Sequence, residues 1–90
     1  MRYRQLGDSG LTVSLVGIGC NNFGRPMDGN DVAAVVDAAL EAGITLFDTS
    51  DSYGGRPGES EELLGAALKG RRDDAVIATK FGWDMRGANG

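Results

Sequence analysis

Short apolar segments alternate with amphipathic helical segments from Leu15 onward, and this alternation restricts the possible folds more than any other feature of the sequence. The apolar segments cover residues 15–19, 44–47 and 75–79. They begin about 30 residues apart, which is the length of one strand–helix–strand unit. Because strands that are apolar on both faces are buried on both sides, the pattern predicts parallel strands covered by helices.

Two helices are predicted between these strands. The first begins after Asn30 as its N-cap and ends near Gly43. Its apolar side chains recur at the spacing of one helix face: Val32, Val35, Val36, Ala39 and Leu40. The second begins at Ser60 as its N-cap, carries acidic side chains in its first turn and ends at Gly70.

A β-hairpin is predicted ahead of the first parallel strand, because residues 2–6 and 11–13 flank a Gly-Asp-Ser-Gly turn. No linker interrupts residues 1–90, so we expect one α/β domain, with the hairpin in 1–14 and strands one to three with helices one and two in 15–90. Parallel units of this kind build an open doubly wound sheet or a closed barrel. Three strands cannot close a barrel, so we expect a piece of a longer protein that is able to self-associate through open strand edges.

The composition argues against several classes of protein. The net charge of −4 disfavours nucleic-acid binding, which needs clustered Lys and Arg, and the doublet Arg71-Arg72 is followed by two aspartates that predict a self-neutralising turn. Cys20 is the only cysteine, so no intrachain disulfide can form. The sequence shows no secretory signal and no run of about 20 apolar residues. We therefore predict a cytoplasmic protein without a membrane partner.

The glycines near the first strand resemble a dinucleotide fingerprint only in part. Gly17 and Gly19 have the right spacing, but Asn22 occupies the position of the third glycine. The fingerprint must also open a helix directly, whereas residues 23–26 precede the predicted helix. A Rossmann fold is therefore disfavoured.

Three polar side chains stand where strands are predicted to end. Asp48 follows the second strand, Lys80 follows the third, and Tyr53 lies further along the loop after Asp48. Because the carboxyl ends of parallel strands meet at one edge, the ammonium and carboxylate are expected to pair, with the phenol against the ammonium. A nearby cation favours the phenolate, so such a tyrosine can act as a general acid or base. Each residue alone has an ordinary structural explanation, but together they favour a proton-transfer site.

The chain resembles the aldo-keto reductase family over essentially its whole length. The resemblance rests on these motifs: the run Asp48–Gly54 with its Asp-Thr and Tyr-Gly pairs, Ser60-Glu61 and Leu64-Gly65, Ala78-Thr79-Lys80, Gly17-Ile18-Gly19, and the opening Met1–Gly7 with Ser9-Gly10-Leu11 and Val13-Ser14. The family is a TIM-type (β/α)8 barrel that moves a hydride between NADP(H) and a carbonyl or alcohol. The resemblance therefore implies that this chain is the N-terminal hairpin and first three βα units of such a barrel.

The resemblance also implies roles for individual residues. Tyr53 would be the proton donor, Lys80 the charge that assists it, and Asp48 the partner that orients the lysine. Cys20, Asn21 and Asp48 match positions beside the nicotinamide. The family's fourth catalytic residue is a histidine, and this chain contains none, so we expect the 90 residues alone to be inactive.

Other functions are kept open beside an oxidoreductase acting on small carbonyl compounds. One is a non-catalytic binding or regulatory protein on the same scaffold, as in potassium-channel β subunits. Another is a self-associating fragment.

Three further residues and the acidic loop are minor site candidates. An inert small side chain is favoured over a reactive thiol for Cys20, and Phe81 and Trp83 are candidates for either a pocket wall or loop packing. No metal site is expected, because the acidic loop after Asp48 lacks calcium-loop spacing.

Overall fold

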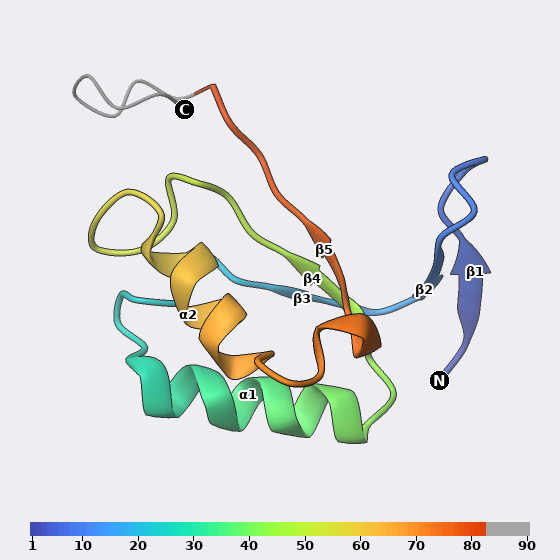
Figure 1. Ribbon diagram of the computed structural model, residues 1–90, viewed down its shortest axis with the longest axis horizontal. Helices are drawn as coiled ribbons and strands as arrows, with labels where there is room; N and C mark the ends of the chain where they lie inside the picture. The colour runs from blue at the N-terminus through green and yellow to red at the C-terminus, as the bar shows by residue number, and fades with distance from the viewer. Residues whose placement is uncertain (83–90) are drawn as a thin grey trace.

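The computed structural model describes residues 1–82 and contains a hairpin, a parallel sheet and two α-helices (Figure 1). In chain order the elements are β1 (Tyr3–Gln5), β2 (Thr12–Ser14), β3 (Gly17–Gly19), α1 (Gly29–Glu41), β4 (Leu46–Asp48), α2 (Glu59–Ala67), the short 3-10 helix η1 (Arg72–Asp74) and β5 (Val76–Ala78). The predicted hairpin and the predicted alternation of strand and helix are both confirmed.

The parallel sheet has the strand order β3-β4-β5, and its register decides which side chains share a face. Ile18 lies opposite Phe47, which lies opposite Ile77, and all three belong to or pack against the core beneath the helices. Since side chains alternate along a strand, the neighbouring row of Gly19, Asp48 and Ala78 faces the other way. The second strand was predicted to end at Phe47, whereas β4 continues to Asp48, so this second row contains one charged side chain between two small residues.

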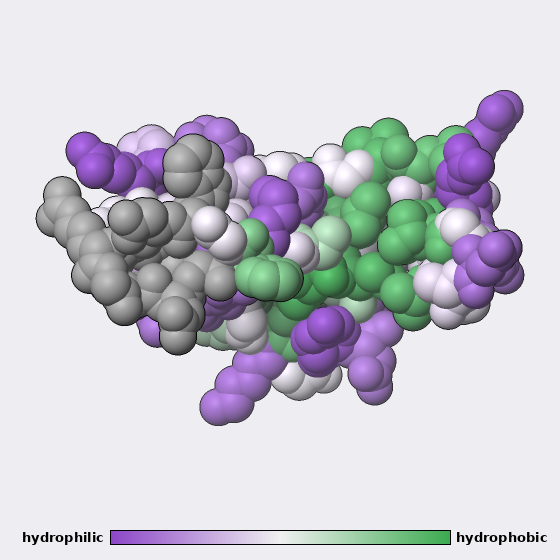
Figure 2. Space-filling model, turned by 90° about the horizontal axis from the view of Figure 1, so that it is seen from above, coloured by the Kyte–Doolittle hydropathy of each residue, from purple (hydrophilic) through white to green (hydrophobic). Residues whose placement is uncertain are grey.

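Both helices pack on one face of the sheet (Figure 1). Phe47 is fully buried at the centre, and α1 and α2 bury Val36 and Leu64 against it in a single core cluster. The opposite face carries no helix within residues 1–82, and Figure 2 shows apolar surface across the middle of that side. The sheet is therefore covered on one side only in the part of the chain that the structure describes.

The helix ends differ from the sequence prediction in two places. Asp28, not Asn30, is the N-cap of α1, and its Oδ1 accepts a hydrogen bond from the backbone N–H of Asp31 at 2.9 Å. Gly58, with a φ of +77°, precedes α2, and no side chain caps this helix. The left-handed turn at Gly58 starts the helix earlier than predicted and turns Ser60 into the interior. The predicted end of α1 is confirmed, because Gly43 adopts a φ of +86° directly after the C-cap.

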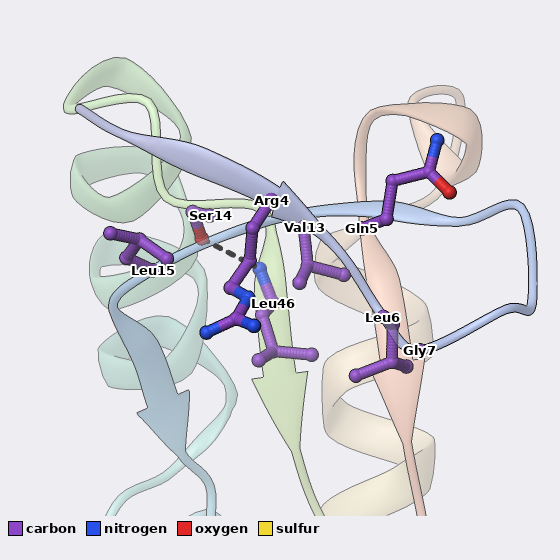
Figure 3. Close-up of a pocket in the computed structure, with 8 residues that line it drawn as sticks. All are labelled: Arg4, Gln5, Leu6, Gly7, Val13, Ser14, Leu15 and Leu46. Atoms are coloured by element: carbon purple, nitrogen blue, oxygen red, sulfur yellow. Dashed lines mark hydrogen bonds between the residues drawn. The ribbon is translucent and has the colours of Figure 1, made fainter.

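The hairpin is attached to the sheet at the amino ends of its strands (Figures 1 and 3). The buried hydroxyl of Ser14 donates to the carbonyl of Val16 at 2.6 Å and accepts from the N–H of Thr45 at 2.9 Å. The hydroxyl of Tyr3 donates to the carbonyl of Gly43 at 2.7 Å. These bonds hold the hairpin at the end of β4 that lies away from Asp48.

Arg71 joins the two helices, so the prediction of a self-neutralising turn is wrong for this residue. Its guanidinium donates to the carbonyl of Ala67 at the end of α2 and forms an ion pair with Asp37 of α1. The charge of Arg71 is therefore paired with Asp37 of α1 and not with the aspartates that follow it in the sequence. No helix among residues 1–82 is long and apolar enough to cross a membrane.

Candidate active site

Asp48 and Lys80 form an ion pair at the carboxyl end of the sheet. The Nζ of Lys80 lies 2.6 Å from Oδ1 of Asp48 and 2.6 Å from the carbonyl oxygen of Thr49, so the ammonium donates two hydrogen bonds to β4 and the residue after it. The register of β4 and β5 places Asp48 beside Ala78. Lys80 follows two residues after Ala78, and its side chain reaches the Asp48 carboxylate. The expected pairing of the two strand ends is confirmed.

The ring of Tyr53 lies close to the same ammonium. The Nζ of Lys80 is 5.0 Å from the centroid of the Tyr53 ring, which is within the range of a cation–π contact. The loop after β4 turns back to allow this, with the N–H of Tyr53 donating to the carbonyl of Ser50 at 3.2 Å. The three residues that the sequence singled out are thus brought together around one charge.

The electrostatics of the group favour a lysine that stays protonated. The hydrogen bond to Asp48 raises the pKa of Lys80 above its usual value, and partial desolvation opposes this less strongly. The Asp48 and Lys80 side chains are 59% and 48% exposed. Because water reaches both groups, the pair contributes little to stability, and its value lies in holding a positive charge at a defined place.

Cys20 lies directly after β3 but offers no group to the solvent. Its side chain is fully buried, its Sγ lies 3.6 Å from the carbonyl oxygen of Ile18, and its backbone N–H donates to the carbonyl of Asp48 at 2.8 Å. Burial, followed by the nearby Asp48 carboxylate, raises the pKa of the thiol to about 11, while Lys80 acts in the opposite direction. This environment favours an inert thiol over a reactive one.

Asn21 is exposed beside an open position on the sheet. A Cβ atom added to Gly19 would lie 3.8 Å from Oδ1 of Asn21 and would meet no other atom outside its own neighbours within 4 Å. Gly19 is next to Asp48 in register, so there is free space beside the carboxylate on the face that the helices leave uncovered. The side chain of Cys20 is enclosed in the core on the side of the helices.

The remaining candidates do not extend this group. Phe81 is 83% exposed, so it does not pack as a loop anchor, and Trp83 lies outside the described residues. Within residues 1–82 there is no cluster of three or more His, Cys, Asp or Glu side chains able to hold a metal ion.

Sequence reasoning missed a buried polar pair beneath the site. Thr49 and Ser60 are fully buried, and their hydroxyl oxygens lie 2.8 Å apart. A second link joins Thr79 to α2, where its hydroxyl donates to Glu61 at 2.7 Å. The sequence placed Ser60 at the N-cap of a helix and placed both residues in motifs of the family resemblance, but neither signal indicated a buried hydrogen bond between them.

Comparison with known proteins gives consistent matches. The model of the Aldo/keto reductase family matches residues 15–90. An uncharacterized oxidoreductase of Bacillus subtilis is 43% identical over 86 residues, which are 93% of this chain and 27% of that protein. A protein of Oryza sativa subsp. japonica, described as a probable voltage-gated potassium channel subunit beta, is 37% identical over 99% of this chain and 28% of its own length.

The fold is also similar to solved structures. The holo form of an aldo-keto reductase from Bacillus halodurans superimposes with a TM-score of 0.80 at 40% sequence identity. The match covers 99% of this chain and 29% of that structure. The chain therefore spans less than a third of the length of these relatives.

Proposed function

The chain belongs to the aldo/keto reductase family, and from this premise we propose that the protein carrying it is an NADP(H)-dependent oxidoreductase that interconverts small aldehydes or ketones and alcohols. The observation that carries the proposal is the Lys80 ammonium, held between the Asp48 carboxylate and the Tyr53 ring at the carboxyl end of the sheet. A phenol beside a positive charge is suited to proton transfer to a carbonyl oxygen, because the cation favours the phenolate that remains.

Tyr53 is the proposed general acid. During reduction its hydroxyl would give a proton to the carbonyl oxygen of the substrate, and the Lys80 ammonium would stabilise the phenolate that remains. Asp48 would orient Lys80 through their hydrogen bond, which also raises the pKa of the lysine and so keeps it charged. In the oxidation direction Tyr53 takes the proton back from the alcohol.

The proposed cofactor site lies in the open space at Gly19, beside Asp48. When bound, NADPH supplies the hydride that the carbonyl carbon receives. The exposed side chains of Asn21 and Asp48 border this space and are the residues proposed to hold the nicotinamide end. Cys20 is proposed to contribute only as the buried residue that shapes the end of β3.

The relatives' greater length leads to a proposal for the whole protein. Residues 1–90 would be the N-terminal part of one (β/α)8 domain, and further strands would cover the apolar face of the sheet that the helices leave open (Figure 2). The histidine and the remaining cofactor contacts would come from that part, so residues 1–90 alone are proposed to be inactive.

A second candidate function follows from the rice relative, which matches 99% of this chain. On this proposal the protein would be a binding or regulatory subunit. Slow or absent turnover of any carbonyl substrate by the purified full-length protein, together with retained NADPH binding, would favour this function over the enzyme.

The test of the first proposal is replacement of the phenol hydroxyl. In the full-length protein, Tyr53→Phe is expected to lower the rate of aldehyde-dependent NADPH oxidation by about 10²- to 10⁴-fold, the usual range for loss of a general acid. Tyr3→Phe is the matched control, because it removes a phenol hydroxyl that bonds to the carbonyl of Gly43, in the hairpin region and away from Lys80. Near-normal turnover by Tyr53→Phe would exclude the assigned role.

A further inference from the structure

We propose that Ser60 is a positioning residue that fixes the relative placement of Lys80 and Tyr53; the proposal rests on the proposed function, since it names what holds that site in shape. Ser60 is fully buried in the first turn of α2, beneath the site. Its hydroxyl and its backbone together connect three segments that carry or support the reacting groups.

The first connection runs to the end of β3. The Ser60 hydroxyl is fully buried and donates to the carbonyl of Cys20 at 2.9 Å. A hydroxyl has one proton, so the 2.8 Å contact between Ser60 and Thr49 has Thr49 as the donor. The Ser60 hydroxyl therefore donates to the Cys20 carbonyl and accepts from the Thr49 hydroxyl, so the orientations of both hydroxyl groups are fixed.

The second connection runs through Thr49 to the ammonium. The carbonyl of Thr49 accepts a hydrogen bond from Nζ of Lys80 at 2.6 Å, and its N–H donates to the carbonyl of Ala78 at 2.8 Å. The side chain of Thr49 is thus held by Ser60 while its peptide groups hold Lys80 and β5. A shift of Thr49 would move the carbonyl that supports the lysine.

The third connection runs to the proton donor. The backbone N–H of Ser60 donates to the carbonyl of Tyr53 at 3.1 Å, so the same residue holds the loop that carries the phenol. Because α2 is packed into the core through Leu64 and through Leu68 at its C-cap, Ser60 provides a rigid base for both groups. Loss of its hydroxyl would leave the buried Cys20 carbonyl and Thr49 hydroxyl without this partner, and local rearrangement to satisfy them would displace the site.

The experiment compares two buried serines in the full-length protein. Ser60→Ala is expected to lower kcat for aldehyde reduction at least about tenfold with little change in the KM for NADPH, because misplaced reacting groups reduce the rate more than binding. Ser14→Ala is the matched control: Ser14 is equally buried and its hydroxyl also bonds to backbone, but at the amino end of β4 (Figure 3). It is expected to lower the melting temperature without lowering kcat. Ser60→Thr, which restores a hydroxyl, should recover part of the rate.

Two measurements decide the proposal: kcat and the titration of the Lys80 side chain. A normal kcat in folded Ser60→Ala, with activity abolished in Tyr53→Phe, would overturn the positioning role and leave the proposed function intact. Full activity in Tyr53→Phe would exclude the proposed function, and the NMR titration of the Lys80 side chain would then be the only test of the positioning role. An unchanged titration midpoint in Ser60→Ala would overturn the placement of Lys80 by Ser60. A shifted midpoint would support it. If Ser60→Ala does not fold, the closer isostere Ser60→Cys, which is a weaker donor, replaces it in both measurements, with the same results expected.

Discussion

Gly24 lies where the loop after β3 meets the start of α2, and its replacement by alanine tests that contact. A Cβ atom at Gly24 would lie 2.8 Å from Cγ and 2.8 Å from Cδ of Glu59, with the carboxylate Oε1 closer still. The φ of Gly24 is +93°, which alanine adopts at a cost of about 1–2 kcal/mol. Glu59 must also move, and its Oε1 then loses the hydrogen bond from the N–H of Gly55 at 2.7 Å. That bond contributes about 1–2 kcal/mol at this partly exposed side chain.

Gly24→Ala is therefore expected to lower the free energy of unfolding by about 2–4 kcal/mol, measured by urea unfolding followed by circular dichroism. Gly70→Ala separates the two contributions, because Gly70 has a φ of +84° but no atom within 4 Å of its added Cβ. This control is expected to cost only the backbone contribution of about 1–2 kcal/mol. In a Glu59→Ala background, Gly24→Ala should cost no more than the control. Equal destabilisation by Gly24→Ala and Gly70→Ala in the unmodified background would refute the steric argument.

Two further predictions concern the groups around Lys80. Cys20, with its pKa raised to about 11 by burial, is expected to resist iodoacetamide at pH 8 in the folded protein and to react after addition of urea; labelling of the folded protein at the rate of an exposed thiol would contradict the buried placement. Asp48→Asn should move the NMR titration of Lys80 to lower pH, with Asp51→Asn as the control that leaves it unchanged. The pKa of Lys80 is raised from 10.5 by its hydrogen bond to Asp48. The small contribution of this pair to stability is therefore present below the pKa of Lys80 in the unfolded chain, and it is lost as the pH rises through the pKa in the folded protein. An unaltered titration in Asp48→Asn would show that the pair does not form in solution.

Local patterns in the sequence were sufficient to predict the order of elements. The recurrence of apolar residues in α1, the turn at residues 7–10 and the left-handed Gly43 are each properties of a few consecutive residues. The helix starts were predicted less well, since Asn30 and Ser60 both have side chains suited to an N-cap. Asp28 and Gly58 precede the helices instead, because the direction from which each loop enters its helix is set by packing and not by cap preference alone.

The meeting of Asp48 and Lys80 could be predicted from the sequence, because parallel strands present their carboxyl ends at one edge and both residues stand at such ends. The buried hydrogen bonds beneath them could not be predicted in this way. The hydrogen bond from Ser60 to Cys20 joins residues 40 positions apart in the sequence. Both groups become buried only when α2 packs on the sheet, and burial makes the loss of this bond costly. Burial and long-range hydrogen bonding depend on groups brought together from different segments, so no local pattern distinguishes an exposed cap serine from one enclosed in the core.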